Sequence, residues 1–399
     1  MADDYDVIVA GCGPCGALAA KAAAKAGARV LAIDRRKELG APVRCGEGIG
    51  QHWMDELKVK LNPKCISAEI NGSVLISPDW KRKVALRGGK ETKGFVVDRK
   101  VFDKELALDA GRAGADILVH SEVIGVLKNG GKVCGVKTLV DGKPQEFRSQ
   151  AVIAADGGES TVARFAGINT TSTLYDTDFG MEYEMVNVEC EDLIEVYFSH
   201  RDAPRGYLWV FPKGKDVANV GVGIGGMHAP NAKIYLDKWI KAHPGRFGKA
   251  KTVAIKGGII PVGAPMTDEA VGDGIIVAGT AAHQVDPIHG GGICLAMEAG
   301  KMAGEVAAKH ALSKSCTRAN LLEYAEAYKK TRAPKLLKRL KLRKVLEKLS
   351  DDDFNAVFAH LDDNDIDNLL KGNFAAVVGK MSKLLFTRPG LVKVMAALL

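Results

Sequence analysis

The amino-acid sequence predicts an α/β protein in three parts: a domain built on a parallel sheet, an inserted antiparallel β domain and a helical C-terminal region. Short apolar runs at residues 6–10, 151–155 and 274–278 each end at a glycine or an acid, which is typical of buried parallel strands. Between the last two runs, residues 178–226 alternate apolar and polar side chains in the manner of antiparallel strands. The first domain is therefore discontinuous, and its segments enclose the second.

The composition is that of an ordinary globular protein. Apolar residues make up 47% and charged residues 26% of the 399 positions, and at about 150 residues per domain this length accommodates two or three domains. No run reaches the roughly 18 uncharged apolar residues of a spanning helix, and the acidic Asp3-Asp4 start lacks the basic region of a signal peptide. We therefore expect a cytoplasmic protein. The predicted domains are residues 1–75, 95–165 and 270–320 for the parallel-sheet domain, 76–94 and 166–269 for the β domain, and 321–399 for the helical region.

The first 34 residues carry a dinucleotide-binding motif. A strand over residues 6–10 leads into a glycine turn, a helix over 17–26 and a second strand over 28–33; the turn and the strand end contribute Gly11, Gly13, Gly16 and Asp34. In a Rossmann-like fold the first glycine permits the tight turn, the second lets a pyrophosphate approach the backbone, and the third lets helix and strand pack closely. The helix N-terminus favours the anion, and the acid accepts hydrogen bonds from a ribose diol.

The elements between these landmarks follow from similar patterns. Residues 40–50 are too rich in glycine for a helix or a strand, so we expect a loop there. An Asn129-Gly130-Gly131 turn between residues 123–128 and 133–140 predicts a β-hairpin. The other expected elements are strands within 75–95, a helix over 100–113, a strand over 117–119, a helix carrying Ser160, Ala163 and Arg164, a loop over 280–292, and helices over 293–310 and from residue 321 onward.

The cysteines do not form a disulfide framework, because eight in 399 residues are too few. Cys12 and Cys15 form a C-x-x-C sequence inside the glycine turn. Such a pair is either a redox motif or two small, nearly apolar side chains that fit a crowded turn. We favour the second interpretation. Cys65, Cys134, Cys190 and Cys316 are assigned to packing.

Two further signals accompany the glycine turn. They are the Asp156-Gly157 strand end with Arg164, and the loop that runs from Gly279 through Pro287 to Gly290-Gly291-Gly292. Together the three signals resemble the FAD-binding set of the para-hydroxybenzoate-hydroxylase-like flavoproteins, over roughly the nucleotide-binding half of the chain. The resemblance implies that the third motif places a helix N-terminus near the flavin ring, where it stabilises the anion of the reduced flavin.

One position departs from that family pattern. Thr280 stands where the family has an acid that contacts the ribityl chain or a phosphate. A hydroxyl can still donate and accept hydrogen bonds, so FAD is still expected. His283 and His289 lie in the same loop, and each either tunes the flavin or faces solvent.

Within that superfamily the chain looks like a geranylgeranyl reductase, of the type that saturates archaeal digeranylgeranylglycerophospholipids. The carrying residues are Pro42-Val43-Arg44-Cys45-Gly46-Glu47-Gly48, the Tyr207-x-Trp209-x-Phe211-Pro212-x-Gly214 motif, and the Pro287 to Ile293 loop. At period two, the three aromatic residues share one face of a strand, an apolar wall suited to an isoprenoid chain. The alternative is that these three residues are ordinary core aromatics of a β domain and do not contact a substrate.

The resemblance implies a set of site residues. Cys45, Tyr207 and Trp209 are expected to be catalytic, and Tyr207, Trp209 and Phe211 to bind the substrate. A separate hypothesis, based only on the fact that both residues neighbour expected flavin loops, is that Cys45 pairs with Cys294 in a redox-active disulfide. The expected FAD-binding residues are Gly11, Gly13, Cys15, Gly16, Asp34, Cys45, Gly46, Gly48, Arg99, Val123, Asp156, Gly279, Thr280, Gly292 and Ile293. No metal site is expected.

The implied reaction saturates isolated C=C bonds of geranylgeranyl chains with a hydride from reduced FAD and a proton. An isolated alkene has no carbonyl to polarise it, so positive charge develops on carbon, and Trp209 can stabilise it by cation–π attraction. Cys45, Tyr207 and a histidine of the flavin loop are candidate acids. No second glycine-rich nucleotide motif is visible, so a stable NADPH site is not expected. The expected electron donor is a ferredoxin-like protein or transiently bound NAD(P)H. An FAD-dependent aromatic or quinone monooxygenase and a membrane flavoprotein electron carrier remain alternatives.

A basic segment near the C-terminus predicts binding to an anionic membrane surface. Residues 329–348 hold ten Lys or Arg and one acid, in a chain of net charge +8. Nucleic acid is not expected, because the segment lacks aromatic side chains for base stacking. An amphipathic helix at the membrane is favoured over a helix packed on its own domain. Residues 384–399 could contribute to membrane binding, and the apolar stripe of the helix consists of Leu336, Leu337, Leu340, Leu342, Val345, Leu346 and Leu349.

Overall fold

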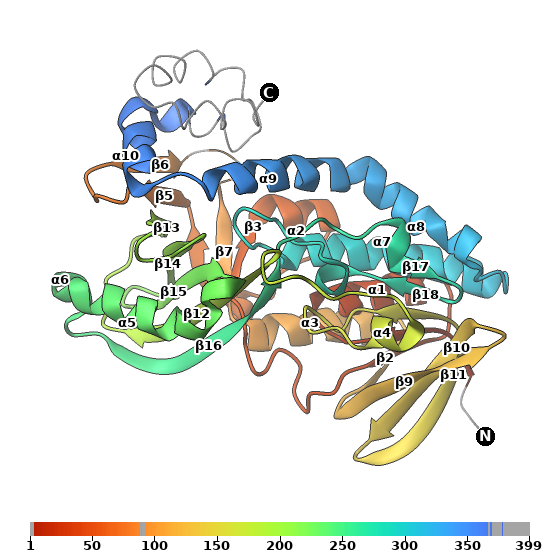
Figure 1. Ribbon diagram of the computed structural model, residues 1–399. Helices are drawn as coiled ribbons and strands as arrows, with labels where there is room; N and C mark the ends of the chain where they lie inside the picture. The colour runs from red at the N-terminus through yellow and green to blue at the C-terminus, as the bar shows by residue number, and fades with distance from the viewer. Residues whose placement is uncertain (1–3, 88, 90–91, 366–367, 369–376, 378–399) are drawn as a thin grey trace. The chain divides into compact units, whose positions relative to one another are not determined.

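The computed structural model describes residues 4–365 apart from residues 88, 90 and 91, together with residues 368 and 377 (Figure 1). The chain forms two compact units. Unit 1 comprises residues 1–43, 99–173 and 260–337, and unit 2 comprises residues 44–98, 174–259 and those from 338 onward. Compared with the predicted domains, residues 44–75 lie in unit 2, because strands β3 (Gly48–Gly50) and β4 (Ile66–Ile70) both pair with β7 (Gly94–Val97).

Unit 1 is built on an eight-stranded sheet with a parallel centre (Figure 1). Its parallel strands are, in spatial order, β18 (Ile275–Val277), β11 (Lys143–Ala154), β1 (Asp4–Ala10), β2 (Val30–Ile33) and β8 (Asp116–Leu118). Strand β17 (Val271–Gly272) pairs antiparallel with β18, and the hairpin of β9 (Ser121–Asn129) and β10 (Lys132–Val140) extends from β11. The predicted parallel sheet and hairpin are confirmed.

Helix packing in unit 1 requires glycine at two places on helix α7 (Ile293–Leu312). A Cβ on Gly300 would lie 2.0 Å from the carbonyl oxygen of Cys15, and one on Gly304 would lie 2.2 Å from that of Ala19. The backbone of α7 therefore lies directly against the first helix of the unit, and a side chain at either glycine would separate the two helices. The helices of unit 1 besides α7 include α1 (Pro14–Lys25), α3 (Arg99–Arg112), α4 (Val162–Ala166) and α8 (Arg318–Thr331).

Unit 2 contains a seven-stranded sheet that confirms the predicted β domain (Figure 1). In spatial order its strands are β16 (Lys251–Pro261), β12 (Thr177–Val186), β15 (Val217–Gly225), β14 (Tyr207–Pro212), β13 (Leu193–Phe198), β5 (Gly72–Ile76) and β6 (Lys83–Arg87). Strands β12, β15, β14 and β13 pair antiparallel, whereas β13 and β5 run parallel. The helices include α2 (Gln51–Leu57), α5 (Ala232–Ala242), α6 (Pro244–Phe247) and α10 (Asp351–His360).

The prediction of a loop over residues 40–50 is wrong for residues 48–50. Residues Gly48–Gly50 form strand β3, which pairs antiparallel with β7. Glycine has low strand propensity, but the ladder that β7 offers and the burial of Ile49, which is 5% exposed, outweigh it here.

The predicted basic amphipathic helix forms as α9 (Ala333–Leu346). Part of its apolar stripe is used inside the protein, since Leu336 and Leu340 are 3% and 7% exposed, while Leu337 is 43% exposed. Arg343 is also buried and pairs with Glu347 at 2.9 Å. None of the described helices is long and apolar enough to cross a membrane. The predicted membrane segment at residues 384–399 lies outside the described residues.

Candidate functional site

The three predicted nucleotide signals meet in unit 1. A Cβ on Gly11, whose φ is +95°, would lie 2.9 Å from Cα of Asp156, and one on Gly279 would lie 2.8 Å from Sγ of Cys15. A Cβ on Gly13, in contrast, would meet only Nη2 of Arg36, at 3.8 Å. The N-cap residue of α1 is Gly13, which has no side chain to cap the helix, so the first N–H groups of α1 and the open space at Gly13 fit a dinucleotide pyrophosphate.

Asp34 ends β2 as predicted, and its carboxylate is fully engaged. Oδ2 accepts from the Cys12 N–H at 2.9 Å and from Nη2 of Arg36 at 2.8 Å, while Oδ1 accepts from the N–H and Nε of Arg36, both at 2.9 Å. Burial alone would raise the pKa of Asp34, but these hydrogen bonds outweigh it and the pKa is lowered. All four lone-pair sites are occupied, so a ribose diol could reach the carboxylate only if Arg36 moved.

Asp156 caps helix α4. Its Oδ2 accepts from the N–H groups of Thr161 and Val162 at 2.7 and 3.1 Å, and its Oδ1 accepts from the Ser160 hydroxyl at 2.8 Å. Ser160 therefore precedes the helix on which it was expected. The carboxylate of Asp156 serves the fold, which leaves its backbone as the part that lies beside the glycine turn.

The loop after β18 brings its predicted residues together at the start of α7. Gly292 is the N-cap of α7 and has no side chain to cap that end; a Cβ on Gly292 would lie 3.6 Å from Oγ1 of Thr280. The N–H of Gly279 donates to Oε1 of the buried Gln284 at 2.7 Å. Nε2 of His283 lies 3.0 Å from the Thr170 carbonyl oxygen, so this ring is held by unit 1 itself.

The remaining predicted residues of unit 1 have structural partners. Arg99 donates to the buried Asp103 at 2.6 and 2.8 Å, and the partly buried Val123 of β9 packs against the core of unit 1. Burial raises the pKa of both Cys12 and Cys15 to about 12. A thiolate is therefore disfavoured at either position, which favours the packing interpretation over a redox motif.

The second group of predicted residues meets in unit 2. The rings of Tyr207 and Trp209 lie 5.8 Å apart between centroids, and those of Trp209 and Phe211 lie 6.1 Å apart, so the three share one face of β14. The segment of residues 45–48, called the glycine loop below, lies against this face, because a Cβ on Gly46 or on Gly48 would be 3.2 Å from Cε2 of Phe211. Cys45 stands at the start of that loop, and its Sγ accepts from the Glu47 N–H at 3.3 Å.

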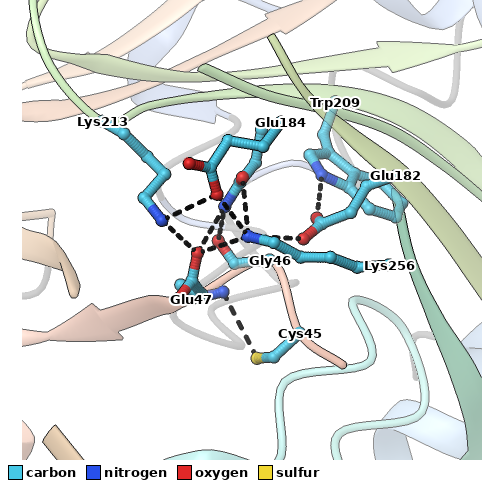
Figure 2. A network of polar contacts seen from close by, with 9 residues as sticks. Cys45, Gly46, Glu47, Glu182, Glu184, Trp209, Lys213 and Lys256 are labelled. Atoms are coloured by element: carbon cyan, nitrogen blue, oxygen red, sulfur yellow. Dashed lines mark hydrogen bonds and ion pairs between the residues drawn. The ribbon is translucent and has the colours of Figure 1, made fainter. Parts of the chain in front are cut away.

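A buried charge cluster joins the glycine loop to the sheet (Figure 2). Glu47 is 0% exposed, and its Oε2 accepts from Nζ of Lys213 and of Lys256, both at 2.8 Å, and from Nδ2 of Asn219 at 2.9 Å. Glu184 also lies against both lysines, at 3.1 and 2.9 Å. Glu47 has φ +71°, a strained backbone that this cluster holds in place.

Glu182 completes the cluster beside the aromatic face (Figure 2). The indole N–H of Trp209 donates to its Oε2 at 3.2 Å. A Cβ on Gly221 would lie 2.3 Å from the Trp209 ring and 2.8 Å from Cβ of Glu182, so this glycine is needed for the ring and the acid to lie side by side. The sequence patterns predicted no functional role for Glu182, Glu184, Lys213, Asn219 or Lys256. The feature that could have pointed to them is the presence of charged side chains within segments that otherwise have the pattern of strands.

Matches to known protein families cover the segments that contain both groups of residues. Residues 176–260 match the model of the geranylgeranyl reductase catalytic domain, and residues 6–193 match that of the FAD-dependent oxidoreductases. The digeranylgeranylglycerophospholipid reductase of Methanoculleus marisnigri is 40% identical over 85% of both chains. Digeranylgeranylglycerophospholipid reductase 2 of Methanococcoides burtonii is 37% identical over 98% of this chain and 97% of that protein.

A solved structure supports the same assignment. A geranylgeranyl bacteriochlorophyll reductase-like protein of Thermoplasma acidophilum is 34% identical, with a TM-score of 0.91 over 100% of both chains. The catalytic-domain match contains Glu182, Trp209 and Lys256, and the oxidoreductase match contains the glycine turn. The chain belongs to the geranylgeranyl reductase family of FAD-dependent oxidoreductases.

Proposed function

We propose that this protein is an FAD-dependent reductase that saturates the isolated C=C bonds of geranylgeranyl chains in archaeal-type glycerophospholipids. The observation that carries the proposal is the meeting of the Cys45–Gly48 loop with the aromatic face of β14 inside unit 2. An apolar, aromatic surface suits an isoprenoid chain, and the curated relatives are named for this lipid class.

The residues of unit 1 would hold FAD mainly through backbone. Gly11, Gly13 and Gly16 with the start of α1 would take the pyrophosphate, and Asp34 the ribose, after Arg36 has moved. Reduced FAD supplies the hydride of the reaction. We further assign to FAD binding Cys15, Arg99, Val123, Asp156, Gly279, Thr280, Gly292 and Ile293 in unit 1, and Cys45, Gly46 and Gly48 in unit 2.

The residues of β14 would bind and protect the reacting chain. Tyr207, Trp209 and Phe211 would contact the isoprenoid, and the π face of Trp209 would stabilise positive charge on carbon. Exclusion of water by this apolar wall would prevent capture of that positive carbon by a water molecule. Cys45 would lie beside the reacting carbons, and its disulfide with Cys294 remains a prediction.

Mass spectrometry of the lipid product tests the function. A digeranylgeranylglycerophospholipid incubated anaerobically with dithionite-reduced protein should gain about 2 Da per double bond, since each saturation adds a hydride and a proton. Protein kept oxidised is the control and should leave the mass unchanged. A product that gains oxygen only in air would indicate the monooxygenase, and flavin reoxidation by a quinone with unchanged lipid would indicate the electron carrier. Replacing dithionite by ferredoxin or NAD(P)H then identifies the donor.

We also propose that α9 binds an anionic membrane surface from the cytoplasmic side. Lys335, Lys338, Lys341 and Lys344 are all exposed, and each basic residue near such a surface contributes about 1 kcal/mol. Replacing all four with glutamine should weaken binding to phosphatidylserine vesicles on the order of 1000-fold at low salt.

A flotation assay measures this binding. The matched control replaces four exposed lysines elsewhere, Lys58, Lys60, Lys137 and Lys143, and should bind like the wild type. Binding of the wild type should also fall steeply with salt. Equal loss in both variants, or binding that salt does not change, would contradict a role for α9.

A further inference from the structure

Glu182 is a buried acid with one oxygen that makes no hydrogen bond to any residue that the structure describes. The residue is 2% exposed on β12. Its Oε2 accepts from the Trp209 indole N–H, whereas its buried Oε1 has no hydrogen-bond partner in the described part of the chain and lies 3.6 Å from Nζ of Lys256. An ionised carboxylate in this position would leave an acceptor unsatisfied, a costly arrangement inside a protein.

We propose that Glu182 is the acid that protonates the substrate alkene, a role that rests on the proposed function. The Oε1–H bond breaks and a C–H bond forms at one alkene carbon, while the other carbon receives the hydride that reduced FAD supplies. The alkene gains two electrons and two hydrogens, and FAD is oxidised by two electrons. Glu182 is left as a carboxylate and regains its proton from water before the next turnover.

The charges around Glu182 favour a neutral acid before the reaction. Burial, with a smaller contribution from Glu47, raises the pKa of Glu182 to about 8; Lys256, the Trp209 N–H and Lys213 act in the opposite direction. The lysines hold Glu47 and Glu184 ionised against burial, and the pKa of both is lowered. With Glu182 protonated, two carboxylates balance two ammonium groups, and the cluster is neutral.

The same neighbours stabilise the carboxylate once the proton has left. The Trp209 N–H then donates to a charged acceptor, which strengthens the hydrogen bond, and the Lys256 ammonium lies within 3.6 Å. A carboxylate next to the indole also adds negative potential near the ring on which positive carbon would be stabilised. Lys256 itself is a poor acid, because its carboxylate partners outweigh burial and raise its pKa above the ordinary value.

The histidines of the flavin loop suit this task less well. Nε2 of His283 lies within hydrogen-bond distance of the Thr170 carbonyl oxygen and the Ser172 hydroxyl. His289 is half exposed and pairs with Asp286 at 3.3 Å. Neither ring is enclosed as Glu182 is, and a dry site is needed to keep water from the developing charge.

Glu182→Gln tests the proposal in the FAD-loaded protein. Glutamine keeps the size and can accept from Trp209, but it cannot supply the proton. We expect unchanged FAD content and lipid binding, with saturation slowed about 10²–10⁴-fold. The matched control is Asp178→Asn, which removes another acid of β12 whose pKa burial raises, to about 7. It should saturate lipid at the wild-type rate.

Infrared spectroscopy gives a reading that does not depend on turnover. Protein labelled with ¹³C at glutamate carboxyls should show a protonated glutamic acid band at pH 7 that is lost with a midpoint near pH 8, and the band should be absent from Glu182→Gln. A wild type without such a band, or a Glu182→Gln variant that saturates lipid within threefold of the wild type, overturns the proposal.

The two readouts separate the possible failures. If Glu182→Gln does not fold, the band of the labelled wild type decides, because its presence supports the acid and its absence overturns it. If the wild type shows the band but leaves the lipid unchanged, the proposed function fails. The assignment of the lipid alkene as the group that receives the proton of Glu182 then fails as well.

Discussion

Replacing Lys256 with methionine is expected to lower the free energy of unfolding by about 3–5 kcal/mol, the usual loss when one partner of a buried ion pair is removed. Nζ of Lys256 lies 2.8 Å from Glu47 and 2.9 Å from Glu184, and its side chain is 7% exposed. Without this ammonium, the buried Glu47 and the half-buried Glu184 share Lys213 alone among the lysines of the cluster. Urea unfolding followed by near-ultraviolet circular dichroism measures the loss.

The matched control is Lys251→Met on the same strand. Lys251 is exposed, so its replacement should change the unfolding free energy by no more than about 0.5 kcal/mol. A Lys256→Met protein that unfolds at the urea concentration of the wild type would show that the cluster does not depend on this charge. Adding Glu47→Gln should recover part of the loss, because it removes one of the two stranded carboxylates.

The same cluster makes the free energy of unfolding depend on pH in the acidic range. Burial alone would raise the pKa of Glu47 and of Glu184, but the lysines outweigh it and both values are lowered. Their stabilising contribution is therefore complete above the unfolded pKa of about 4.3 and is lost as the pH falls through the lower folded values. The wild type should lose more stability than Lys256→Met over that range.

The parallel sheet was predictable because the residues that specify each of its units lie close together in the sequence. The run from Asp6 to Asp34 contains strand, turn, helix and strand in sequence, and the structure repeats the steric reasons for Gly11 and Gly16. The hairpin turn is equally local, since Gly130 and Gly131 both take positive φ, at 56° and 87°. The alternation along β14 likewise placed Tyr207, Trp209 and Phe211 on one face.

The charge cluster was not predictable, because its members are distant in the sequence. Glu47 and Lys256 are 209 residues apart, and only the fold brings them to 2.8 Å. Alternation along β12 puts Glu182 opposite the apolar Met181 and Tyr183, which predicts a solvated face, yet Glu182 is 2% exposed. The glycine loop covers that face, and β3 within the loop exists only because β7 pairs with it. Tertiary contacts therefore decide both the missed strand and the missed acid.

Replacing Gly16 with alanine is expected to abolish stable FAD binding and to destabilise unit 1 severely. A Cβ at this position would lie 1.8 Å from the carbonyl oxygen of Gly11 and 2.9 Å from its carbon. Both atoms are backbone at the end of β1, so no change of rotamer relieves the overlap, and α1 would have to move away from the strand. Destabilisation above about 4 kcal/mol is expected for such a change, and thermal unfolding with the FAD absorbance of the purified protein measures both effects.

Gly13→Ala is the matched control, because the same methyl group meets different surroundings three residues earlier. A Cβ on Gly13 would lie 3.8 Å from the Arg36 guanidinium, an ordinary contact, so the FAD-free protein should unfold at the wild-type temperature. Its FAD affinity should nevertheless fall, since the added methyl enters the space where a pyrophosphate approaches the backbone. Wild-type affinity in Gly13→Ala would place the pyrophosphate elsewhere, and wild-type stability in Gly16→Ala would contradict the close packing of α1 on β1. Loss of affinity in both variants with loss of stability in Gly16→Ala alone separates the glycine that the cofactor needs from the glycine that the fold needs.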